Sequence, residues 1–366
     1  MAAPIRVAHV IGKMVGGGVE QVVMNYYRYI DRERVQFDFI VDEDSTVVPR
    51  DEIESLGARI FIVPPYQSLF SYQRKLGRLF QAERWSIVHS HVNTLSVFPL
   101  RAAKRAGIPV RIAHSHATAG RGEPARNAIK YALRPLANRY PTERLACSLY
   151  AGKWLFGSAE FGILVNAFDL DGLSFDRVAR ERFRKNVGIG ENVFVFGHAG
   201  RFAPPKNQAR LIRIFNDVAA VRPNCMLVFA GQGPDLKFCK TLVCNLGLDS
   251  RVLFLGQYQD MAAFYSGIDT FVLPSTYEGL GLALVEAQDA GLPCISSSGV
   301  SQEANPTNEV RYVAYNDDVA WREAMIDSRV RRDRTLSKNE REALSAFDIS
   351  IAATKLMNFY LQCLES

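Results

Sequence analysis

The stretch Thr270–Glu286 reads TFVLPSTYEGLGLALVE and combines three structural signals. Its first four residues, Thr270 to Leu273, are the β-branched, aromatic and aliphatic side chains typical of a short buried strand. A polar loop follows, in which Gly279 and Gly281 free the backbone from side-chain constraints. The end of the stretch is predicted to begin a helix. A strand, a loop and a helix in this order form the unit from which parallel sheets are built.

The same unit recurs along the whole chain. Short β-branched and aromatic runs alternate with longer segments whose apolar residues have helical spacing. The runs are 5–11, 37–41, 59–63, 87–91, 110–114, 145–148 and 163–165 in the first half, and 193–198, 226–230, 252–255, 270–273, 294–296 and 310–314 in the second. This alternation predicts an α/β fold made of two doubly wound, parallel-sheet domains in tandem.

The boundary between the two predicted domains falls near residue 170. The segment 169–190 is polar, rich in arginine and interrupted by glycines, as expected of a connection between domains. We therefore predict a first domain over residues 1–170 and a second over 171–340. Apolar residues at helical spacing within 341–366 predict a terminal helix, which we expect to pack back on the first domain.

Length and composition exclude several classes of protein. At about 150 residues per domain, a chain of 366 residues favours two domains over one small binding module. Hydrophobic residues make up 48% and charged residues 22%, which excludes general disorder. No apolar run reaches the roughly 18 to 20 residues of a membrane-spanning helix, and the start lacks the pattern of a secretion signal. Because neither feature is found, we predict a cytoplasmic protein. Six cysteines without a Cys-x-x-Cys pair are interpreted as reduced thiols.

The net charge of +6 arises in the first half of the chain. Residues 1–170 contain 22 basic and 15 acidic side chains. Many of the basic residues have spacings that suit exposed helix faces, namely Arg74, Lys75, Arg78, Arg101, Lys104, Arg105, Arg121, Arg126, Lys130, Arg134, Arg139 and Arg144. Two interpretations stay open: a solvated surface, or a site for an anionic partner such as a membrane or a phosphorylated lipid. Nucleic acid is not expected as a partner, because no nucleic-acid-binding motif accompanies the charge.

Two glycine- or proline-containing loops after predicted strands are candidate anion sites, because ligands of parallel sheets bind beyond the carboxyl ends of strands. The loop 12–20 contains three consecutive glycines, whose free N–H groups at a helix start would suit a phosphate. It matches neither the P-loop nor the dinucleotide-binding pattern, and a simple tight turn is the alternative. Arg201 and Lys206 flank a loop with two prolines and can converge on one diphosphate; a solvated loop is the alternative there.

The segment 274–286 carries the strongest set of candidate residues. Glu278 lies in the loop, and Glu286 lies just over one turn into the predicted helix. A helix N-terminus with free N–H groups suits phosphate oxygens, and a carboxylate on either side can accept hydrogen bonds from the hydroxyls of a sugar or a ribose. The pattern predicts a nucleotide-sugar site, and helix capping by the two acids explains the whole set less well.

Two His-Ser-His sequences, at 89–91 and 114–116, end predicted strands. Residues two apart on a strand point to the same side, so each histidine pair is a conceivable pair of metal ligands. No carboxylate or cysteine in a matching position completes such a site, so we expect no metal. His89 and His114 are interpreted as core or hydrogen-bonding residues. His116 stands at the strand end, before the loop 117–122, and is predicted to face a substrate.

Several motifs together resemble those of one enzyme family. They are Glu-x7-Glu at 278 and 286 within Glu-Gly-Leu-Gly, Gly-Arg-Phe at 200–202 followed by Lys-Asn at 206–207, Gly-Gly-Val-Glu at 17–20 and Ala-Gly-Gln-Gly at 230–233. Across essentially its whole length the chain resembles the retaining glycosyltransferases of family 4, whose GT-B fold has two Rossmann-like domains facing across a cleft. Glu-Ala-Gln at 286–288, Ala-Gly-Leu-Pro at 290–293 and Ile-Ala-His-Ser-His at 112–116 resemble the branch that builds capsular and exported polysaccharides.

The resemblance implies a donor-binding role for matching residues of the second domain. Arg201 and Lys206 would bind the diphosphate and stabilise it as the leaving group. Glu278 would contact the donor sugar, and Glu286 the ribose. Phosphate would meet the backbone of Gly279, Leu280, Gly281 and Leu282.

From the first domain, the resemblance implies that Gly17 and Gly18 close over the donor and that His116 faces the reacting centre. The implied catalytic residues are His116, Glu278, Arg201 and Lys206. No metal or other cofactor is expected, because the nucleotide-sugar is a substrate and positive side chains neutralise the leaving group. One departure from the family pattern is Ala167 within Asn-Ala-Phe-Asp at 166–169, where the family has glycine, and it leaves the role of Asn166 open.

The expected function is transfer of a sugar from a nucleotide-sugar, in particular a uridine diphosphate sugar, to a saccharide or lipid-linked saccharide acceptor. An acceptor at the inner membrane face would give peripheral contact with anionic lipid. Two alternatives stay open: a nucleotide-sugar 2-epimerase of the same fold, and a non-catalytic nucleotide-sugar-binding partner. Closure of the two domains over the donor is expected for two such domains joined by a glycine-containing linker.

Overall fold

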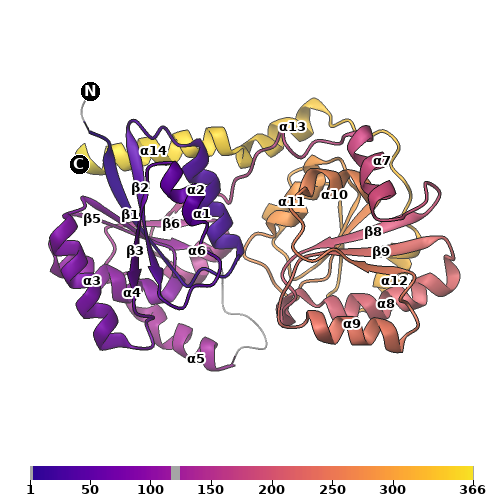
Figure 1. Ribbon diagram of the computed structural model, residues 1–366, viewed down its shortest axis with the longest axis horizontal. Helices are drawn as coiled ribbons and strands as arrows, with labels where there is room; N and C mark the ends of the chain where they lie inside the picture. The colour runs from indigo at the N-terminus through magenta and orange to yellow at the C-terminus, as the bar shows by residue number, and fades with distance from the viewer. Residues whose placement is uncertain (1–2, 117–123, 366) are drawn as a thin grey trace. The chain divides into compact units, whose positions relative to one another are not determined.

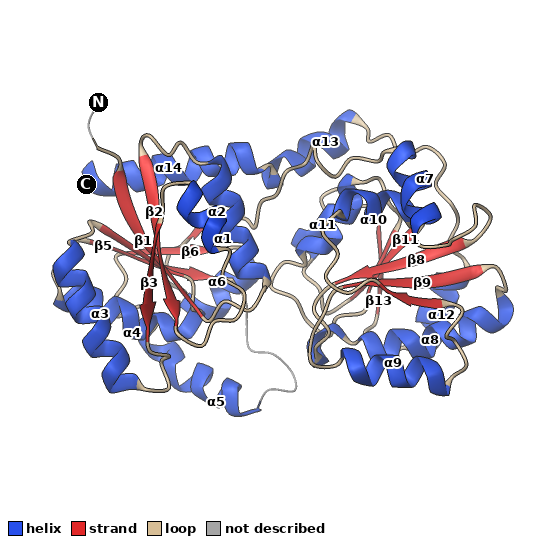
Figure 2. Cartoon of the chain, in the orientation of Figure 1, coloured by secondary structure: helices blue, strands red, loops and turns tan. Residues whose placement is uncertain are grey.

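The computed structural model describes residues 3–116 and 124–365, with the side chains of 124–127 excepted. The described residues form two compact units, one made of residues 3–116, 124–168 and 346–365, the other of residues 169–345. Each unit is a parallel sheet with helices on both faces (Figure 1). The strands of each sheet stand between two helical layers in Figure 2. These features confirm the predicted α/β class with two doubly wound parallel sheets.

The first unit contains a seven-stranded sheet in the order β3-β2-β1-β4-β5-β6-β7, and every pairing is parallel. Its strands are β1 (Ile5–Gly12), β2 (Val35–Asp42), β3 (Arg59–Val63), β4 (Ile87–Ser90), β5 (Val110–Ser115), β6 (Glu143–Ala146) and β7 (Gly162–Ile163). The strand order reverses between β1 and β4. The carboxyl ends of those strands therefore form the position where ligands of such sheets bind.

The helices of the first unit bury one face each against this sheet. In α3 (Leu69–Glu83), Tyr72, Leu76 and Phe80 recur every four residues and are buried, whereas the other faces carry charge. The remaining helices are α1 (Gly18–Tyr29), α2 (Arg50–Ser55), α4 (Val97–Arg105), α5 (Pro124–Leu133), α6 (Leu149–Phe156) and α14 (Ile349–Glu365), with short 3₁₀ helices η1 (Asn93–Ser96) and η2 (Arg134–Leu136).

The second unit contains a six-stranded sheet in the order β10-β9-β8-β11-β12-β13, again parallel throughout. Its strands are β8 (Phe194–Ala199), β9 (Cys225–Ala230), β10 (Val252–Phe254), β11 (Thr270–Leu273), β12 (Cys294–Ser297) and β13 (Val310–Val313). Its helices are α7 (Arg177–Asn186), α8 (Gln208–Val221), α9 (Leu236–Asn245), α10 (Met261–Gly267), α11 (Leu282–Asp289), α12 (Asp318–Ile326) and α13 (Lys338–Leu344), with 3₁₀ helices η3 (Pro204–Lys206) and η4 (Gln302–Ala304). The order reverses between β8 and β11.

The C-terminal segment differs from the single helix that the spacing predicts. A 3₁₀ turn, η5 (Ser345–Phe347), separates α13 in the second unit from α14 in the first. Asp348 starts α14 afresh, because its carboxylate accepts a hydrogen bond from the N–H of Ser350 at 2.7 Å. The backbone of Phe168 bonds to Phe347 and Ile349 on either side of this turn. Helix α14 then packs against α1 within the first unit.

Candidate functional site

Lys206 and Glu278 form the centre of the candidate site in the second unit. The strand β8 leads to η3, which ends at Lys206, and β11 leads to the loop that carries Glu278. The two strands are neighbours, so both loops leave the same edge of the sheet. Lys206 Nζ lies 2.6 Å from Glu278 Oε1, and the hydroxyl of Ser275 donates to the same oxygen at 2.7 Å. The structure therefore brings together two of the predicted catalytic side chains.

Arg201 follows the same strand, and its side chain is exposed to solvent. The sequence predicted that Arg201 and Lys206 converge on one anion. In the structure, the ammonium group of Lys206 is paired with the carboxylate of Glu278. Because the guanidinium group of Arg201 is exposed, it is available to a ligand at little cost in lost hydration.

Gly281 provides the backbone turn that begins α11. Its φ of +86° lies in the left-handed region, and a Cβ atom there would approach Val300 Cγ1 to 3.0 Å. Glycine is therefore required at this helix start. Because the N-cap residue is a glycine, no side chain caps the helix, and its first N–H groups belong to Leu282 and Ala283. The predicted phosphate-binding segment 279–282 thus lies at a helix N-terminus, with Leu280 buried beneath it.

Glu286 lies on α11, one turn beyond the start of the helix. The hydroxyl of Tyr265 donates to Glu286 Oε2 at 2.6 Å. Burial raises the pKa of Glu286 above its usual value, whereas the Tyr265 hydrogen bond and the positive charge of Lys206 lower it. Tyr265 therefore holds one carboxylate oxygen of Glu286 in place, and it was not foreseen from the sequence.

The glycine loop of the first unit is organised differently from the prediction. The carboxylate of Glu20 accepts hydrogen bonds from the N–H groups of Val15, Gly16 and Gly17 at 2.9, 2.6 and 2.7 Å. The N–H groups of Val15, Gly16 and Gly17 are thus occupied, because the carboxylate of Glu20, the third residue of α1, reaches back to the loop. At Gly18, an added Cβ would meet no described atom within 4 Å.

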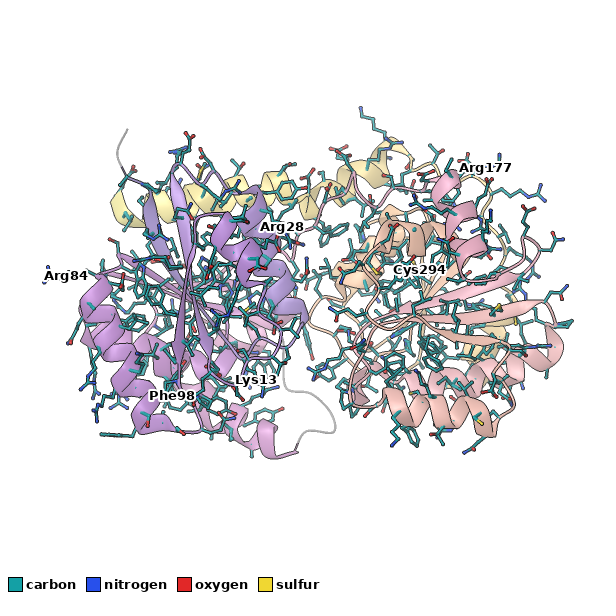
Figure 3. All side chains as sticks on the ribbon, in the orientation of Figure 1. Lys13, Arg28, Arg84, Phe98, Arg177 and Cys294 are labelled. Atoms are coloured by element: carbon teal, nitrogen blue, oxygen red, sulfur yellow. The ribbon has the colours of Figure 1, made fainter. Side chains whose placement is uncertain are left out.

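Lys13 lies at the start of the same loop and is labelled in Figure 3. Its ammonium group pairs with Asp44 at 2.6 Å. Nearby Asp42 is buried, and burial together with the charge of Asp44 raises its pKa to about 7.

All four histidines of the two His-Ser-His sequences are buried in the first unit, together with His9, which the sequence did not single out. His91 Nδ1 lies 2.9 Å from His116 Nε2, and His91 Nε2 lies 2.9 Å from His9 Nδ1. His116 is 7% exposed, and its Nδ1 has no close hydrogen-bond partner among the described residues. Burial lowers the pKa of His116 to about 4, and neighbouring Asn166 acts in the opposite direction.

Two histidine triads satisfy the distance requirement of a metal centre. The nitrogen atoms of His9, His89 and His91 lie within 4.8 Å of one another, and so do those of His91, His114 and His116. From the sequence we considered histidine pairs on single strands and expected no metal. Register between β1 and β4, which sets His9 opposite His89, is what produces a triad.

Most of the predicted basic surface lies on helices of the first unit, but Arg144 lies on strand β6 and Arg139 in the loop before it. Arg74, Lys75 and Arg78 are exposed on α3, and Arg101, Lys104 and Arg105 are exposed on α4. Beside them, Leu69 and Phe70 at the start of α3 are 43% and 78% exposed. On α5, Ile129 and Tyr131 are 44% and 54% exposed. Arg121 and the side chain of Arg126 lie outside the described residues.

No helix in the described ranges, 3–116 and 124–365, has the length and apolar character that crossing a membrane requires.

Comparison with protein-family models gives two matches. Residues 17–151 match the family described as glycosyl transferase 4-like domain. Residues 179–320 match the family described as glycosyl transferases group 1. The second match contains all the candidate residues of the second unit.

Three curated relatives match most of the chain. EpsF of Bacillus subtilis (strain 168), which carries the description glycosyltransferase, is 34% identical over 82% of this chain and 81% of its own. The UDP-Gal:α-D-GlcNAc-diphosphoundecaprenol α-1,3-galactosyltransferase of Escherichia coli is 26% identical over 98% and 97%. The capsular polysaccharide biosynthesis glycosyltransferase CapH of Staphylococcus aureus is 23% identical over 98% and 99%.

A solved structure with the same fold is Anabaena HepE in complex with UDP and glucose. It superimposes with a TM-score of 0.82 at 19% identity, over 98% of this chain and all of HepE. At this identity the likeness establishes the shared fold, which is GT-B.

Proposed function

This chain belongs to the group 1 glycosyl transferases and is a glycosyltransferase of polysaccharide biosynthesis; we propose that it transfers a sugar from a uridine diphosphate sugar, with retention of configuration, to a saccharide or lipid-linked saccharide. The observation that carries this proposal is the pairing of Lys206 with Glu278 beside the uncapped start of α11. The arrangement places a cation, a helix N-terminus and a carboxylate at one edge of a sheet. In a sugar diphosphate, the phosphates would contact the cation and the helix N-terminus, and the sugar hydroxyls would contact the carboxylate.

Each group has a defined task in the proposed reaction. The diphosphate displaces Glu278 from Lys206, and Lys206 and Arg201 then neutralise the charge that grows on the leaving group. The released carboxylate of Glu278 accepts hydrogen bonds from hydroxyls of the donor sugar. Glu286, held by Tyr265, accepts those of the ribose. The bond from sugar C1 to the diphosphate oxygen breaks, and the bond from C1 to the acceptor oxygen forms on the same face of the ring. The proton of the acceptor hydroxyl passes to the departing diphosphate.

The proposed donor and acceptor draw support from two relatives. HepE has been crystallised with UDP and glucose, and the name of the E. coli relative specifies UDP-Gal and an undecaprenol-linked acceptor. Lysine, arginine and helix dipole supply the positive potential in this proposal, so the transfer needs no metal. Activity in the presence of EDTA is expected to equal that in its absence.

Peripheral contact with an anionic membrane, at the cytoplasmic face, forms part of the proposal. The start of α3 combines an exposed Phe70 with Arg74 and Lys75, and α5 exposes Tyr131. Aromatic side chains favour the boundary between lipid headgroups and acyl chains, and basic side chains are attracted to anionic headgroups. A lipid-linked acceptor would be presented at such a surface.

The first experiment measures ligand-induced thermal stabilisation across a panel of nucleotide-sugars. One donor is expected to stabilise the wild-type protein by mass action and to have no effect on Arg201→Ala or Glu286→Ala. Arg213→Ala, an exposed arginine on α8, serves as the matched control and keeps the stabilisation. A donor that stabilises all four proteins equally contradicts the assigned site.

The second experiment identifies the product. The anomeric configuration of the new bond, measured by NMR, is expected to match that of the donor. Inverted product contradicts retention. A changed sugar nucleotide formed without acceptor would favour the 2-epimerase alternative, and binding without turnover for any acceptor would favour a non-catalytic partner.

A further inference from the structure

The loop 200–206 carries both cations of the proposed donor site. It joins the end of β8 to the start of α8, two elements that Figure 1 labels in the second unit. The side chain of Arg201 is exposed, and an exposed arginine can change rotamer, so its main chain decides which space the guanidinium group can reach. The residues that hold the main chain of this loop therefore determine how its cations are presented.

The segment after β9 holds the loop on one side. The N–H of Gly200 donates to the carbonyl of Ala230, and the N–H of Phe202 donates to the carbonyl of Gln232, each at 2.9 Å. A Cβ atom on Gly231 would overlap the carbonyl oxygen of Gly200, so the two backbones can approach this closely only with a glycine. The Ala-Gly-Gln-Gly motif thus binds the loop immediately before and after Arg201.

The segment after β11 holds the other end of the loop. Both the N–H and the hydroxyl of Thr276 donate to the carbonyl of Pro205, at 2.8 and 3.3 Å. Pro205 directly precedes Lys206, so these bonds tie Lys206 to the loop that carries its partner Glu278. Neither segment contacts the carbonyl of Arg201, which is bound by a different residue.

Gln208, the first residue of α8, holds the carbonyl of Arg201 from the interior of the unit. Gln208 is 1% exposed, and its Nε2 donates to the carbonyl oxygen of Arg201 at 2.9 Å. Because a carbonyl oxygen can only accept, this contact establishes which end of the side-chain amide is the NH₂ group. With its neighbours bound to the segment after β9, the main chain of Arg201 is thereby held from both sides.

His198 on β8 fixes the same amide a second time. Its Nδ1 lies 2.9 Å from the carbonyl oxygen of Val272, which can only accept, so Nδ1 carries a proton. Its Nε2 lies 3.3 Å from Nε2 of Gln208. A proton on the histidine Nε2 would face an NH₂ group that has no lone pair to offer, and burial lowers the pKa of His198 to about 4, so the ring is neutral. The two hydrogens of the NH₂ group thus have one acceptor each.

This orientation leaves Oε1 of Gln208 buried without a hydrogen-bond partner among the residues that the structure describes. Turning the amide over would place Oε1 against the carbonyl oxygen of Arg201 and the lone pair of His198. A buried oxygen without a partner destabilises the fold, and a methionine would fill similar space without that cost. What the chain gains from a glutamine here is therefore the pair of donated bonds.

We propose that Gln208 is a positioning residue for the donor diphosphate: its amide, oriented by His198, holds the carbonyl of Arg201 and so sets where the guanidinium group meets the phosphates. The inference rests on the proposed function, in which Arg201 binds a diphosphate. Gln208 and His198 act through Arg201, and neither has to touch the ligand. Lys206 is held by Thr276 instead, so its contribution does not depend on Gln208.

Binding of UDP to the full-length chain, measured by calorimetry, tests this role. Gln208→Met removes both donated bonds without burying a charge, and it is expected to raise the Kd for UDP about tenfold. Gln73→Met is the matched control, because Gln73 on α3 of the first unit also donates its side-chain NH₂ group to a carbonyl, that of Phe98, at 2.8 Å. The control should bind UDP as the wild type does. A wild-type Kd in folded Gln208→Met overturns the proposal.

A double-mutant cycle separates positioning from a general loss of structure. In an Arg201→Ala background, Gln208→Met is expected to change the Kd by less than about twofold, whereas in a Lys206→Ala background it should still cost about tenfold. Equal losses in the two backgrounds would mean that Gln208 does not act through Arg201, and they overturn this inference alone. Wild-type protein that does not bind UDP overturns the proposed donor, and the inference with it.

Two replacements test the part played by His198. The side chain of His198→Gln can place its amide oxygen near the position of Nε2, whereas that of His198→Asn ends near the position of Nδ1. His198→Gln is therefore expected to bind UDP more tightly than His198→Asn, because only the longer side chain offers Gln208 an acceptor. Equal affinities of the two variants would overturn the orienting role of His198.

Nitrogen-15 NMR of ligand-free wild-type protein labelled at histidine measures the orientation directly. His198 is expected to have a protonated Nδ1 and an unprotonated Nε2. In Gln208→Met the Nδ1 proton should remain, because the carbonyl of Val272 remains, and the Nε2 resonance should shift as its hydrogen bond is lost. A protonated Nε2 in the wild type would overturn the proposal. Should Gln208→Met not fold, the wild-type spectrum and the two His198 variants still decide.

Discussion

The two sheets carry different kinds of side chain at the carboxyl ends of their strands. In the first unit, five neutral histidines and a tyrosine are linked by hydrogen bonds in a fully buried network. In the second, Lys206 pairs with Glu278, Arg201 is exposed, and a carboxylate at Glu286 is held by a tyrosine. Both edges occupy the same place in a doubly wound sheet, so the fold does not dictate this difference.

The difference follows from the chemistry of the proposed ligands. A diphosphate is negatively charged, and it binds to cationic side chains. Mobile or exposed cations suit it, because they stay hydrated until the ligand binds. Sugar hydroxyls are neutral, and they are bound well by uncharged acceptors that are already oriented. A buried imidazole meets that need because burial keeps it unprotonated. Each edge therefore carries groups that can replace the water molecules around its proposed ligand.

The largest expected effect is a selective loss of stability of the first unit in acid. A histidine with a lowered folded-state pKa contributes stability that is fully present above its unfolded value of about 6.5 and is lost as the pH falls towards the folded-state value. That value is about 4 for His116 and for His198. At pH 5, a histidine with a folded-state pKa of about 4 costs about 2 kcal/mol. The first unit has five buried histidines with a lowered pKa, and the second has one.

Urea denaturation at pH 7.5 and pH 5, with peptides of each unit followed by hydrogen-exchange mass spectrometry, measures this effect. The first unit is expected to lose much more stability than the second. Equal losses in both units would mean that the histidine network is protonated or hydrated in solution, and the contrast between the two edges would disappear.

The next effect concerns the charged edge. Replacing Lys206 by alanine is expected to lower kcat by about 10² to 10³, because a preorganised positive group at the leaving diphosphate is lost. Lys237→Ala, an exposed lysine on α9, is the control and should keep full activity. Steady-state kinetics with the donor identified by thermal stabilisation provides the measurement. A small change in kcat with a large change in KM would assign Lys206 to ground-state binding alone.

A smaller effect is expected for Tyr265→Phe. The variant loses a hydrogen bond to a carboxylate, a contact worth about 1.5 to 3 kcal/mol. Without that bond the pKa of Glu286 rises further, because burial then acts with less opposition. Donor affinity, measured by calorimetry, should fall most at acidic pH. Tyr258→Phe lies outside the site and should bind as the wild type does; equal affinities for both variants would contradict the role given to Glu286.

The smallest effect is expected at the basic surface. Arg74→Gln and Lys75→Gln should each weaken binding to anionic vesicles by about 1 kcal/mol. The matched control is Arg177→Gln with Arg182→Gln, two exposed arginines on α7 of the second unit, which should leave binding unchanged. Vesicle sedimentation measures the difference. Wild-type protein that does not sediment with anionic lipid would remove membrane contact from the proposal.

The fold was largely predictable because each strand–loop–helix unit has a local signature. The run 270–273 and the glycines after it mark β11 and its loop without reference to any other segment. The terminal region was not predicted in full. Apolar spacing continues through 341–366, so it cannot reveal that the chain crosses from one unit to the other at Ser345–Phe347.

The residues of the candidate site also fall into two groups, those identified from the sequence and those identified only from the structure. Glu278, Glu286 and Lys206 belong to short motifs, so spacing alone identified them. Tyr265 and Tyr360 belong to no motif, and they reach their partners from other helices of their own unit. Glu20 was part of a quoted motif, but its contacts with the loop N–H groups became evident only in the structure.

The sequence by itself determined the two parallel sheets, the loops that hold the chemistry and the charges available for a diphosphate, because these depend on neighbours within a few residues. Only the tertiary structure decided what the histidines do. Strand register sets His9 opposite His89, and α14 brings Tyr360 to the same point from 271 residues further along the chain. Hydrogen-bond direction and burial are properties of such assembled groups, since neither exists until distant segments exclude water together.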